Sequence, residues 1–212
     1  ITLILDSTFR FYCSDTYDEY QIMKDTGIDF LVIEDTGKTW PTEDLKVSIL
    51  SYSESVAREV REIYEEIYLC SSNFSLAFLG ALAEKTAQYG VDKVVLPEVE
   101  KRKQQFRQAL VGSLLHIEEP QSCTNLPLIW MRCNQEGLSD IQLVDELKKH
   151  DVVLLPGRNF YWNNPEKHTK NVRAFLMRPD EMFQAGIVEL RRGLDEISGN
   201  NFITDKLVLS RE

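Results

Sequence analysis

The sequence predicts an α/β protein, and three observations support that class. Short apolar runs alternate along the chain with segments whose apolar residues recur at helical spacing. Glycine and proline residues stand at several of the boundaries between these segments. Of the 212 residues, 43% are hydrophobic and 27% are charged, which is typical of a folded chain that buries a sizeable core.

The chain opens with the run Ile1–Leu5, which is apolar on both faces of a strand. Runs of this kind occupy the middle of parallel sheets. A central strand with nothing before it suggests a sequence that starts inside a domain, so we expect a fragment. We then expect a helix from Asp15 to Thr26 that ends at Gly27, a buried strand over Phe30–Ile33, a polar loop from Glu34 to Asp44, and a third strand over Leu45–Leu50.

Two helices and a change of composition follow. Ser53 caps an amphipathic helix that runs to about Tyr68, and Ser71 or Ser72 opens another that ends at Gly90. A long charged helix over about 92–112 then links two domains, 1–90 and 91–212. In the second domain we expect strands over Leu126–Cys133, Val152–Leu155 and Val172–Met177, helices over Ser139–His150 and from Pro179 to about Ile197, and a turn at Pro156-Gly157.

Charge and metal-ligand spacing exclude several classes of function. A net charge of −10, with one basic cluster at Lys101–Lys103, argues against nucleic-acid binding. The four cysteines form no C-x-x-C pair, and His116, His150 and His168 share no ligand spacing, so we expect no metal site. No apolar run approaches the length of a membrane span. We therefore expect a cytoplasmic protein with reduced thiols and no membrane or nucleic-acid partner.

Charged side chains follow two of the predicted strands at the points where the apolar runs stop. Asp6 follows the first strand, and the second leads through Glu34 to Lys38. Open α/β sheets bind ligands at the carboxyl ends of their strands, and a lysine there is suited to Schiff-base chemistry. The alternative, a nucleotide-binding P-loop ending at Lys38, needs a glycine five positions before Gly37. Val32 stands there, so the nest of backbone N–H groups that binds phosphate cannot form.

Four segments occur in a recognisable order: Ile4–Arg10, Glu34–Val47, Asp151–Phe160 and Asn171–Phe175. They resemble, in turn, the D-E-x-Y-R strand end, the S-x-S-K-x-[FW]-x-x-x-G-[LY]-[RK]-[IV]-G segment, the G-V-x-V-x-P-G-x-x-F turn and the x-[VI]-R-[IL]-[SG]-[FY] strand of the class I/II aminotransferases. These enzymes depend on pyridoxal 5'-phosphate (PLP). The resemblance covers essentially the whole chain. It implies the remainder of a three-layer α/β/α large domain, followed by a smaller α/β carboxy-terminal domain.

The resemblance implies a role for each matching residue. Asp6 would pair with the protonated pyridine nitrogen of PLP and keep the ring cationic. Lys38 would form the Schiff base and later carry the proton of the substrate α-carbon. Lys46 stands where the family usually has an arginine that binds the cofactor phosphate. Arg173 would hold the substrate α-carboxylate through two parallel hydrogen bonds.

Two positions depart from the family pattern. Phe9 lies in the cofactor site where the family usually has a tyrosine that donates to the phenolic oxygen of the cofactor, which phenylalanine cannot do. Asp35 replaces a serine that touches the phosphate, a contact that Thr36 or Thr39 would have to supply. These departures are compatible with an enzyme that uses the same substrate carbanion for elimination, decarboxylation, racemisation or oxidation.

The leading expectation is transfer of an amino group from an amino acid to a keto acid by a homodimer. The alternatives are a lyase, decarboxylase, racemase or oxidase with the same cofactor, or a non-catalytic binding or regulatory domain that uses its acidic surface. The aromatic residue that stacks on the cofactor ring and the glycine loop of the family would precede the first strand. In this family, residues of a second subunit complete the cofactor pocket. We therefore expect the fragment alone to be inactive and to bind PLP weakly or not at all.

Overall fold

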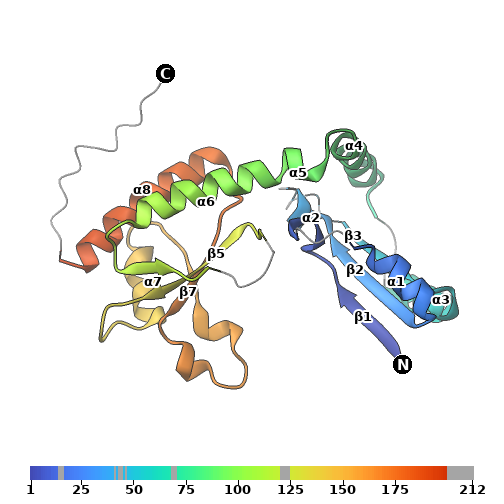
Figure 1. Ribbon diagram of the computed structural model, residues 1–212, viewed down its shortest axis with the longest axis horizontal. Helices are drawn as coiled ribbons and strands as arrows, with labels where there is room; N and C mark the ends of the chain where they lie inside the picture. Colours follow the sequence, from blue (N-terminus) through green and yellow to red (C-terminus); the bar gives the residue numbers. More distant parts are fainter. Residues whose placement is uncertain are drawn as a thin grey trace. The chain divides into compact units, whose positions relative to one another are not determined.

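The computed structural model describes residues 1–13, 17–40, 42, 45, 47–67, 71–119 and 125–199. It confirms the α/β class, because helices and strands alternate along the chain (Figure 1). The described residues fall into two compact units. Unit 1 contains those up to Glu98 together with 125 and 126, and unit 2 contains Val99 to 119 and those from Pro127 onward.

Unit 1 is built on a sheet whose three strands lie in the order β1–β2–β3. β1 and β2 run parallel, with Asp6 opposite Ile33, whereas β3 is antiparallel to β2. The carboxyl ends of β1 and β2 therefore meet at one edge of the sheet, where β3 begins. The strands are β1 (Thr2–Asp6), β2 (Asp29–Asp35) and β3 (Ser48–Tyr52).

The predicted positions of the first two strands are confirmed, but the predicted burial of the first strand is wrong. Its residues alternate between exposed and half-buried, and Ile4 is 66% exposed. Among the described residues β1 is an edge strand, and one of its faces packs on the core of unit 1. That core contains the buried residues Met23, Phe30 and Val32, with Leu3, Leu5, Tyr20 and Ile28 packed against them.

The helices of unit 1 begin and end at the residues that favour such boundaries. The side chain of Asp18 accepts a hydrogen bond from the backbone N–H of Gln21, and Gly27 ends the helix in the left-handed conformation, at φ 65°. Ser72 caps the fourth helix in the same way as Asp18 caps the first. These elements are α1 (Glu19–Thr26), α2 (Thr36–Thr39), α3 (Ala57–Ile67), α4 (Asn73–Tyr89) and the 3₁₀ turns η1 (Arg10–Tyr12) and η3 (Glu54–Val56).

Several boundaries in unit 1 differ from the prediction, and α1 begins at Glu19. Residues 14–16, where the first helix was expected to begin, lie outside the described part. The expected loop after Ile33 is instead the end of β2 followed by the single turn of α2, and the third strand begins at Ser48 rather than Leu45. Ser53 precedes η3 without capping it, because its hydroxyl accepts a hydrogen bond from the backbone N–H of Phe30 at 3.2 Å.

The predicted long helix is two helices, α5 (Val91–Val94) and α6 (Leu96–Leu110), that meet at Val95. Pro97 explains the interruption, because proline has no N–H to donate to the carbonyl four residues earlier. Proline is tolerated in the first turn of a helix, which is where Pro97 lies in α6.

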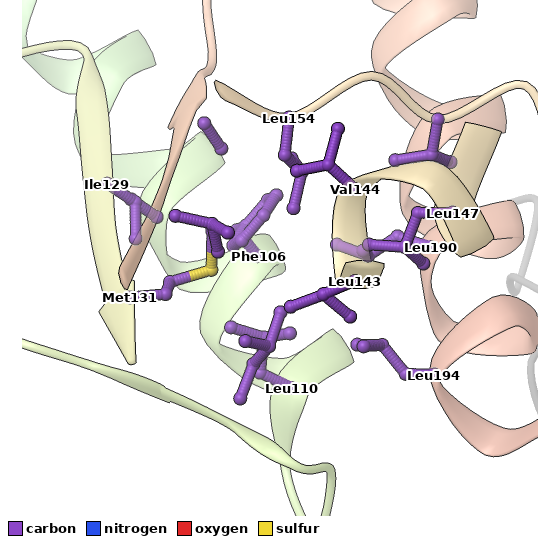
Figure 2. Close-up of a cluster of buried hydrophobic side chains, with 14 of the residues drawn as sticks. Phe106, Leu110, Ile129, Met131, Leu143, Val144, Leu147, Leu154, Leu190 and Leu194 are labelled. Carbon is purple, nitrogen blue, oxygen red and sulfur yellow. The ribbon is translucent and has the colours of Figure 1, made fainter. Parts of the chain in front are cut away.

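Unit 2 is an antiparallel sheet in the order β4–β5–β7–β6, joined to three helices by a single apolar core. Met131, Leu143 and Leu190 are almost fully buried in that core. Figure 2 shows side chains of α6, α7 and α8 meeting those of β5. The elements are β4 (Leu115–Ile117), β5 (Leu128–Cys133), α7 (Asp140–Lys148), β6 (Leu155–Pro156), η4 (Gly157–Phe160), η5 (Pro165–His168), β7 (Asn171–Phe175) and α8 (Asp180–Ile197).

The predicted helices of unit 2 are confirmed, and its strands differ at the edges of the sheet. Ser139 and Gln142 form a capping box at the start of α7, and Pro179 precedes α8. The expected strand over Val152–Leu155 is wrong for most of its length, because only Leu155 and the residue after it pair with β7. The three-residue strand β4 was not predicted.

Gly157 follows β6 at a point where the chain passes very close to β7. A Cβ atom at this position would lie 2.5 Å from both the Cβ atom and the carbonyl oxygen of Asn171. Because Asn171 belongs to β7, it cannot move away without disturbing the sheet. We expect Gly157→Ala to lower the free energy of unfolding by about 1–3 kcal/mol, as overpacking does in a rigid site. Urea unfolding followed by circular dichroism measures this change.

Gly186→Ala is the matched control for this variant. Gly186 lies inside α8, and a Cβ atom there would meet nothing within 4 Å. Alanine is favoured over glycine within a helix by about 0.5–1 kcal/mol, so we expect the control to be neutral or stabilising. Equal destabilisation by both substitutions would contradict the close approach of Gly157 to β7.

Candidate functional site

Asp6 ends β1 at the edge of the sheet where β2 also ends. Its carboxylate accepts hydrogen bonds from the hydroxyl and, at 3.1 Å, from the backbone N–H of Thr8. These bonds close an Asx-type turn that orients the carboxylate as the strand stops. The residue is exposed, and an ionised carboxylate has about four acceptor positions. Asp6 can therefore accept a further hydrogen bond from a ligand.

Lys38 lies on α2, directly after β2, and so belongs to the same edge of the sheet as Asp6. Asp35 fixes the start of α2, because its Oδ1 accepts a hydrogen bond from the backbone N–H of Gly37 at 2.9 Å. The other carboxylate oxygen lies 3.5 Å from Nζ of Lys38, whose side chain is 32% exposed. The amine is thus held near an acid and remains accessible.

The backbone of α2 is anchored by two aromatic side chains. The buried Tyr12 donates its hydroxyl to the carbonyl oxygen of Lys38 at 2.5 Å. Burial raises the pKa of Tyr12 to about 12, so the phenol remains a protonated donor at neutral pH. Trp40, which ends α2, donates from Nε1 to the hydroxyl of Thr86 in α4 at 2.9 Å. Sequence patterns alone did not identify either contact.

Thr36 and Phe9 lie in unit 1 with Asp6 and Lys38. The hydroxyl of Thr36 is buried and donates to the carbonyl oxygen of Val47 at 2.6 Å, which ties α2 to the start of β3. The ring of Phe9 lies 6.0 Å from the ring of Tyr12 and contributes no polar group. Lys46 lies outside the described residues.

An ion pair beside the site joins the segment after β1 to β2 and was not predicted. Nε of Arg10 lies 3.1 Å from Oε2 of Glu34, and the hydroxyl of Tyr20 donates to Oε1 of the same carboxylate at 2.5 Å. Burial is the largest cause that raises the pKa of Tyr20, and the hydrogen bond to Glu34 is the second. The cluster links three elements of unit 1 next to Asp35, which caps α2.

Arg173 belongs to β7 in unit 2, whereas Asp6 and Lys38 belong to unit 1. Its Nε is buried, and none of the residues that the structure describes accepts a hydrogen bond from it. The guanidinium carbon lies 4.3 Å from the centre of the Phe160 ring. Burial lowers the pKa of Arg173, yet arginine stays charged in proteins. A half-buried cation whose buried Nε has no partner is suited to bind a carboxylate.

Metal clusters and membrane-spanning helices are both absent from the described parts of the chain. No group of three His, Cys, Asp or Glu side chains there could hold a metal ion. No helix in the same residues is both long enough and apolar enough to cross a lipid bilayer.

No protein-family model and no curated protein sequence matches the chain. A structure of MppP soaked with the product 2-ketoarginine matches 92% of this chain and 54% of that one, at 31% identity and a TM-score of 0.78. The chain spans about half the length of this structure and of the two aminotransferases described next.

Two named aminotransferases match over a similar share of the chain at lower identity. LysN, the alpha-aminoadipate aminotransferase of Thermus thermophilus, matches 94% of this chain and 51% of its own, at 14% identity and a TM-score of 0.72. YbdL of Escherichia coli, for which a methionine aminotransferase function was identified, matches 89% of this chain and 49% of its own. The identity is 16% and the TM-score is 0.68. At these identities the likeness concerns the fold.

Proposed function

We propose that this chain, which has the fold of the class I/II PLP-dependent aminotransferases, is part of an enzyme that transfers an amino group from an amino acid to a keto acid. The single observation that carries the proposal is the position of Lys38 and Asp6, an accessible amine and an exposed carboxylate at the same edge of one sheet. Because the chain spans about half of its relatives, this activity is proposed for the full-length protein. The resemblance also supports a cytoplasmic homodimer.

The residues present fit the chemistry of PLP. The cofactor needs an amine to bind its carbonyl carbon and an acid to pair with its ring nitrogen, and Lys38 and Asp6 supply these groups. Asp6 retains free acceptor positions beside its bonds to Thr8. LysN was solved with N-(5'-phosphopyridoxyl)-L-leucine, a compound of the cofactor with an amino acid. When bound, PLP supplies an electron sink for the negative charge that develops at the substrate α-carbon.

Each residue of the chain has a distinct part in the proposed reaction. Nζ of Lys38 would take the proton from the substrate α-carbon and deliver it to the cofactor carbon that carried the carbonyl oxygen. Tyr12 and Asp35 hold the short helix that carries this amine. Asp6 keeps a proton on the ring nitrogen of the cofactor, and Arg173 fixes the substrate by its α-carboxylate.

The identity to MppP supports arginine as the first amino donor to test. MppP was soaked with 2-ketoarginine, named as its product, and the identity of 31% is about twice that to LysN or YbdL. 2-Ketoarginine is arginine with its α-amino group replaced by a carbonyl oxygen, so both transamination and oxidative deamination of arginine yield it. Phe9, in place of the tyrosine usual in the family, favours keeping oxidation as the second candidate reaction.

A panel of amino acids, assayed with and without a 2-keto acid, tests the proposal on the full-length protein. Transamination forms 2-ketoarginine only when the acceptor is present, and one molecule of acceptor becomes an amino acid for each arginine consumed. Oxidation instead consumes O₂ and water and releases ammonia and hydrogen peroxide without any acceptor. Added PLP should also give the visible absorbance of a cofactor bound to a lysine. A protein without that absorbance and without turnover would be a binding or regulatory domain.

Asp6→Asn is expected to lower kcat by about 10²–10³-fold, the usual effect of removing one preorganised electrostatic group. Asparagine keeps the size of the side chain and an acceptor for Thr8 but cannot hold a proton on the ring nitrogen. Steady-state kinetics of the full-length enzyme measure the change. Asp25→Asn, which removes an exposed acid from α1, is the control and should leave kcat unaltered. Wild-type kcat in Asp6→Asn would rule out the role assigned to Asp6.

A further inference from the structure

Arg173 lies beside two aromatic residues from different parts of unit 2. Trp130 in β5 is its direct cross-strand neighbour, so the two side chains lie on the same face of the sheet. The ring of Phe160, at the end of η4, stacks on the guanidinium with 4.3 Å between the ring centre and the guanidinium carbon. The same ring forms a T-shaped pair with Trp130, with 5.5 Å between the ring centres and 82° between the planes.

The residues before and after Phe160 are held firmly, although Phe160 itself is 39% exposed. Arg158 forms an ion pair with Asp140, whose side chain is completely buried, and its Nε donates to Oδ1 of that carboxylate at 2.8 Å. Tyr161 stacks on His168, with 3.2 Å between the ring centres and 5° between the planes. The position of the Phe160 ring is therefore set by its neighbours in the chain.

The guanidinium of Arg173 has no such polar support. Its Nε has no hydrogen-bond partner among the residues described, and no described carboxylate forms an ion pair with it. An arginine side chain has several rotatable bonds, and holding it in one arrangement costs conformational entropy. The aromatic face of Phe160 is the contact that restricts the guanidinium before a ligand binds.

We propose that Phe160 is a positioning residue, which holds the guanidinium plane of Arg173 ready for the α-carboxylate of the amino-acid substrate. This inference rests on the proposed function, because it takes the carboxylate as the ligand of Arg173. Phe160 reacts with nothing itself. The Phe160 ring lowers the entropy cost of ordering the Arg173 side chain. Loss of the ring therefore weakens the binding of substrates that carry a carboxylate and leaves the chemical step nearly intact.

The test compares arginine with agmatine, its decarboxylated counterpart, in the full-length PLP-loaded enzyme. The dissociation constant of each is read from the change in visible absorbance of the bound cofactor, which needs no turnover. We expect Phe160→Leu to weaken arginine binding about 5- to 30-fold, the range of a partly desolvated cation–π contact, and to leave agmatine binding unchanged. The KM for arginine should rise by the same factor, with kcat within about twofold of the wild-type value.

Two further variants separate positioning from a general structural effect. Phe160→Tyr keeps the ring and should bind arginine like the wild type. Phe175→Leu removes a ring of β7 that stacks on another arginine, Arg178, at 5.6 Å, and should change neither affinity. Equal weakening of arginine and agmatine by Phe160→Leu, no weakening at all, or failure of Phe160→Tyr to restore binding would overturn the proposal.

Arg173→Gln distinguishes this proposal from the one on which it rests. If Arg173→Gln weakens arginine binding and Phe160→Leu does not, Arg173 binds the carboxylate without help from Phe160, and the positioning role is wrong. If Arg173→Gln leaves arginine binding unchanged, the role proposed for Arg173 is itself wrong and the positioning role is overturned with it.

Discussion

Lys38→Ala in the full-length protein is expected to lower kcat by at least about 10³-fold, because it removes the amine proposed to bind the cofactor and to move the substrate proton. The fold should survive, since the Lys38 side chain is 32% exposed and pairs with the carboxylate of Asp35 at the surface. After borohydride reduction, peptide mass spectrometry should find the cofactor attached to Lys38 in the wild type and to no residue in the variant.

Lys24→Ala and Lys38→Arg are the controls for this variant. Lys24 is exposed on α1, and its removal should change neither kcat nor the attachment of PLP. Lys38→Arg keeps a positive charge beside Asp35 but should be as inactive as Lys38→Ala, because a guanidinium is not a nucleophile at neutral pH. Attachment of the cofactor to another lysine in the wild type, with full turnover in Lys38→Ala, would refute the assignment.

Asp140→Ala is expected to lower the free energy of unfolding by about 3–5 kcal/mol, the range for breaking a buried ion pair by removing one partner. The Asp140 side chain is completely buried and accepts hydrogen bonds from the side chain and backbone of Arg158 and from the backbone N–H of Ile141. Urea unfolding measures the loss. Asp145→Ala, at an exposed acid that pairs with Lys148, should stay within about 0.5 kcal/mol of the wild type.

The same ion pair makes part of this stability dependent on pH. Burial on its own raises the pKa of Asp140, but the hydrogen bonds from Arg158 and from the backbone outweigh it and lower that pKa overall. Folding therefore favours the ionised carboxylate. The stabilisation is complete above the unfolded-state pKa of about 3.9 and is lost as the pH falls through the lower folded-state pKa. Below about pH 4, Asp140→Asn should lose less stability than the wild type; parallel pH profiles would contradict this.

The sequence predicted those elements whose boundaries are set by local chemistry. Gly27 ends α1 in the left-handed conformation, Ser72 caps α4, and Ser139 with Gln142 caps α7, each as the residue types indicate. The resemblance of the whole chain to class I/II aminotransferases is confirmed at the level of the fold by the solved structures. Helix caps and the motifs shared with the aminotransferases both lie in short sequence segments, and each segment can be recognised without knowledge of the others.

Elements that depend on distant residues could not be predicted in this way. α2 is one turn long and is held by Tyr12 and Thr86, which lie 26 residues before Lys38 and 46 residues after Trp40 in the sequence. β6 pairs with β7 through only two residues, too few to give a strand pattern.

The candidate site likewise contains residues that local sequence predicted and a contact that it could not predict. Asp6 and Lys38 were found because each follows an apolar run, and their roles stay proposals until the variants above are measured. In the sequence, Phe160 stands out only as the last residue of a turn motif. Its contact with Arg173 joins residues 13 positions apart on a 3₁₀ turn and a strand, and no local pattern indicates that the two side chains meet.

The tryptophans are distributed so that each unit contains its own optical reporter. Trp40 donates a hydrogen bond within unit 1, Trp130 lies against aromatic rings in unit 2, and Trp162 is 94% exposed. Two proteins, each with Trp162 and one of the other two tryptophans replaced by phenylalanine, would retain a single indole each, and its emission would follow the melting of one unit. Coincident transitions would mean that the units lose structure as one cooperative body, and separated transitions would mean that each melts independently.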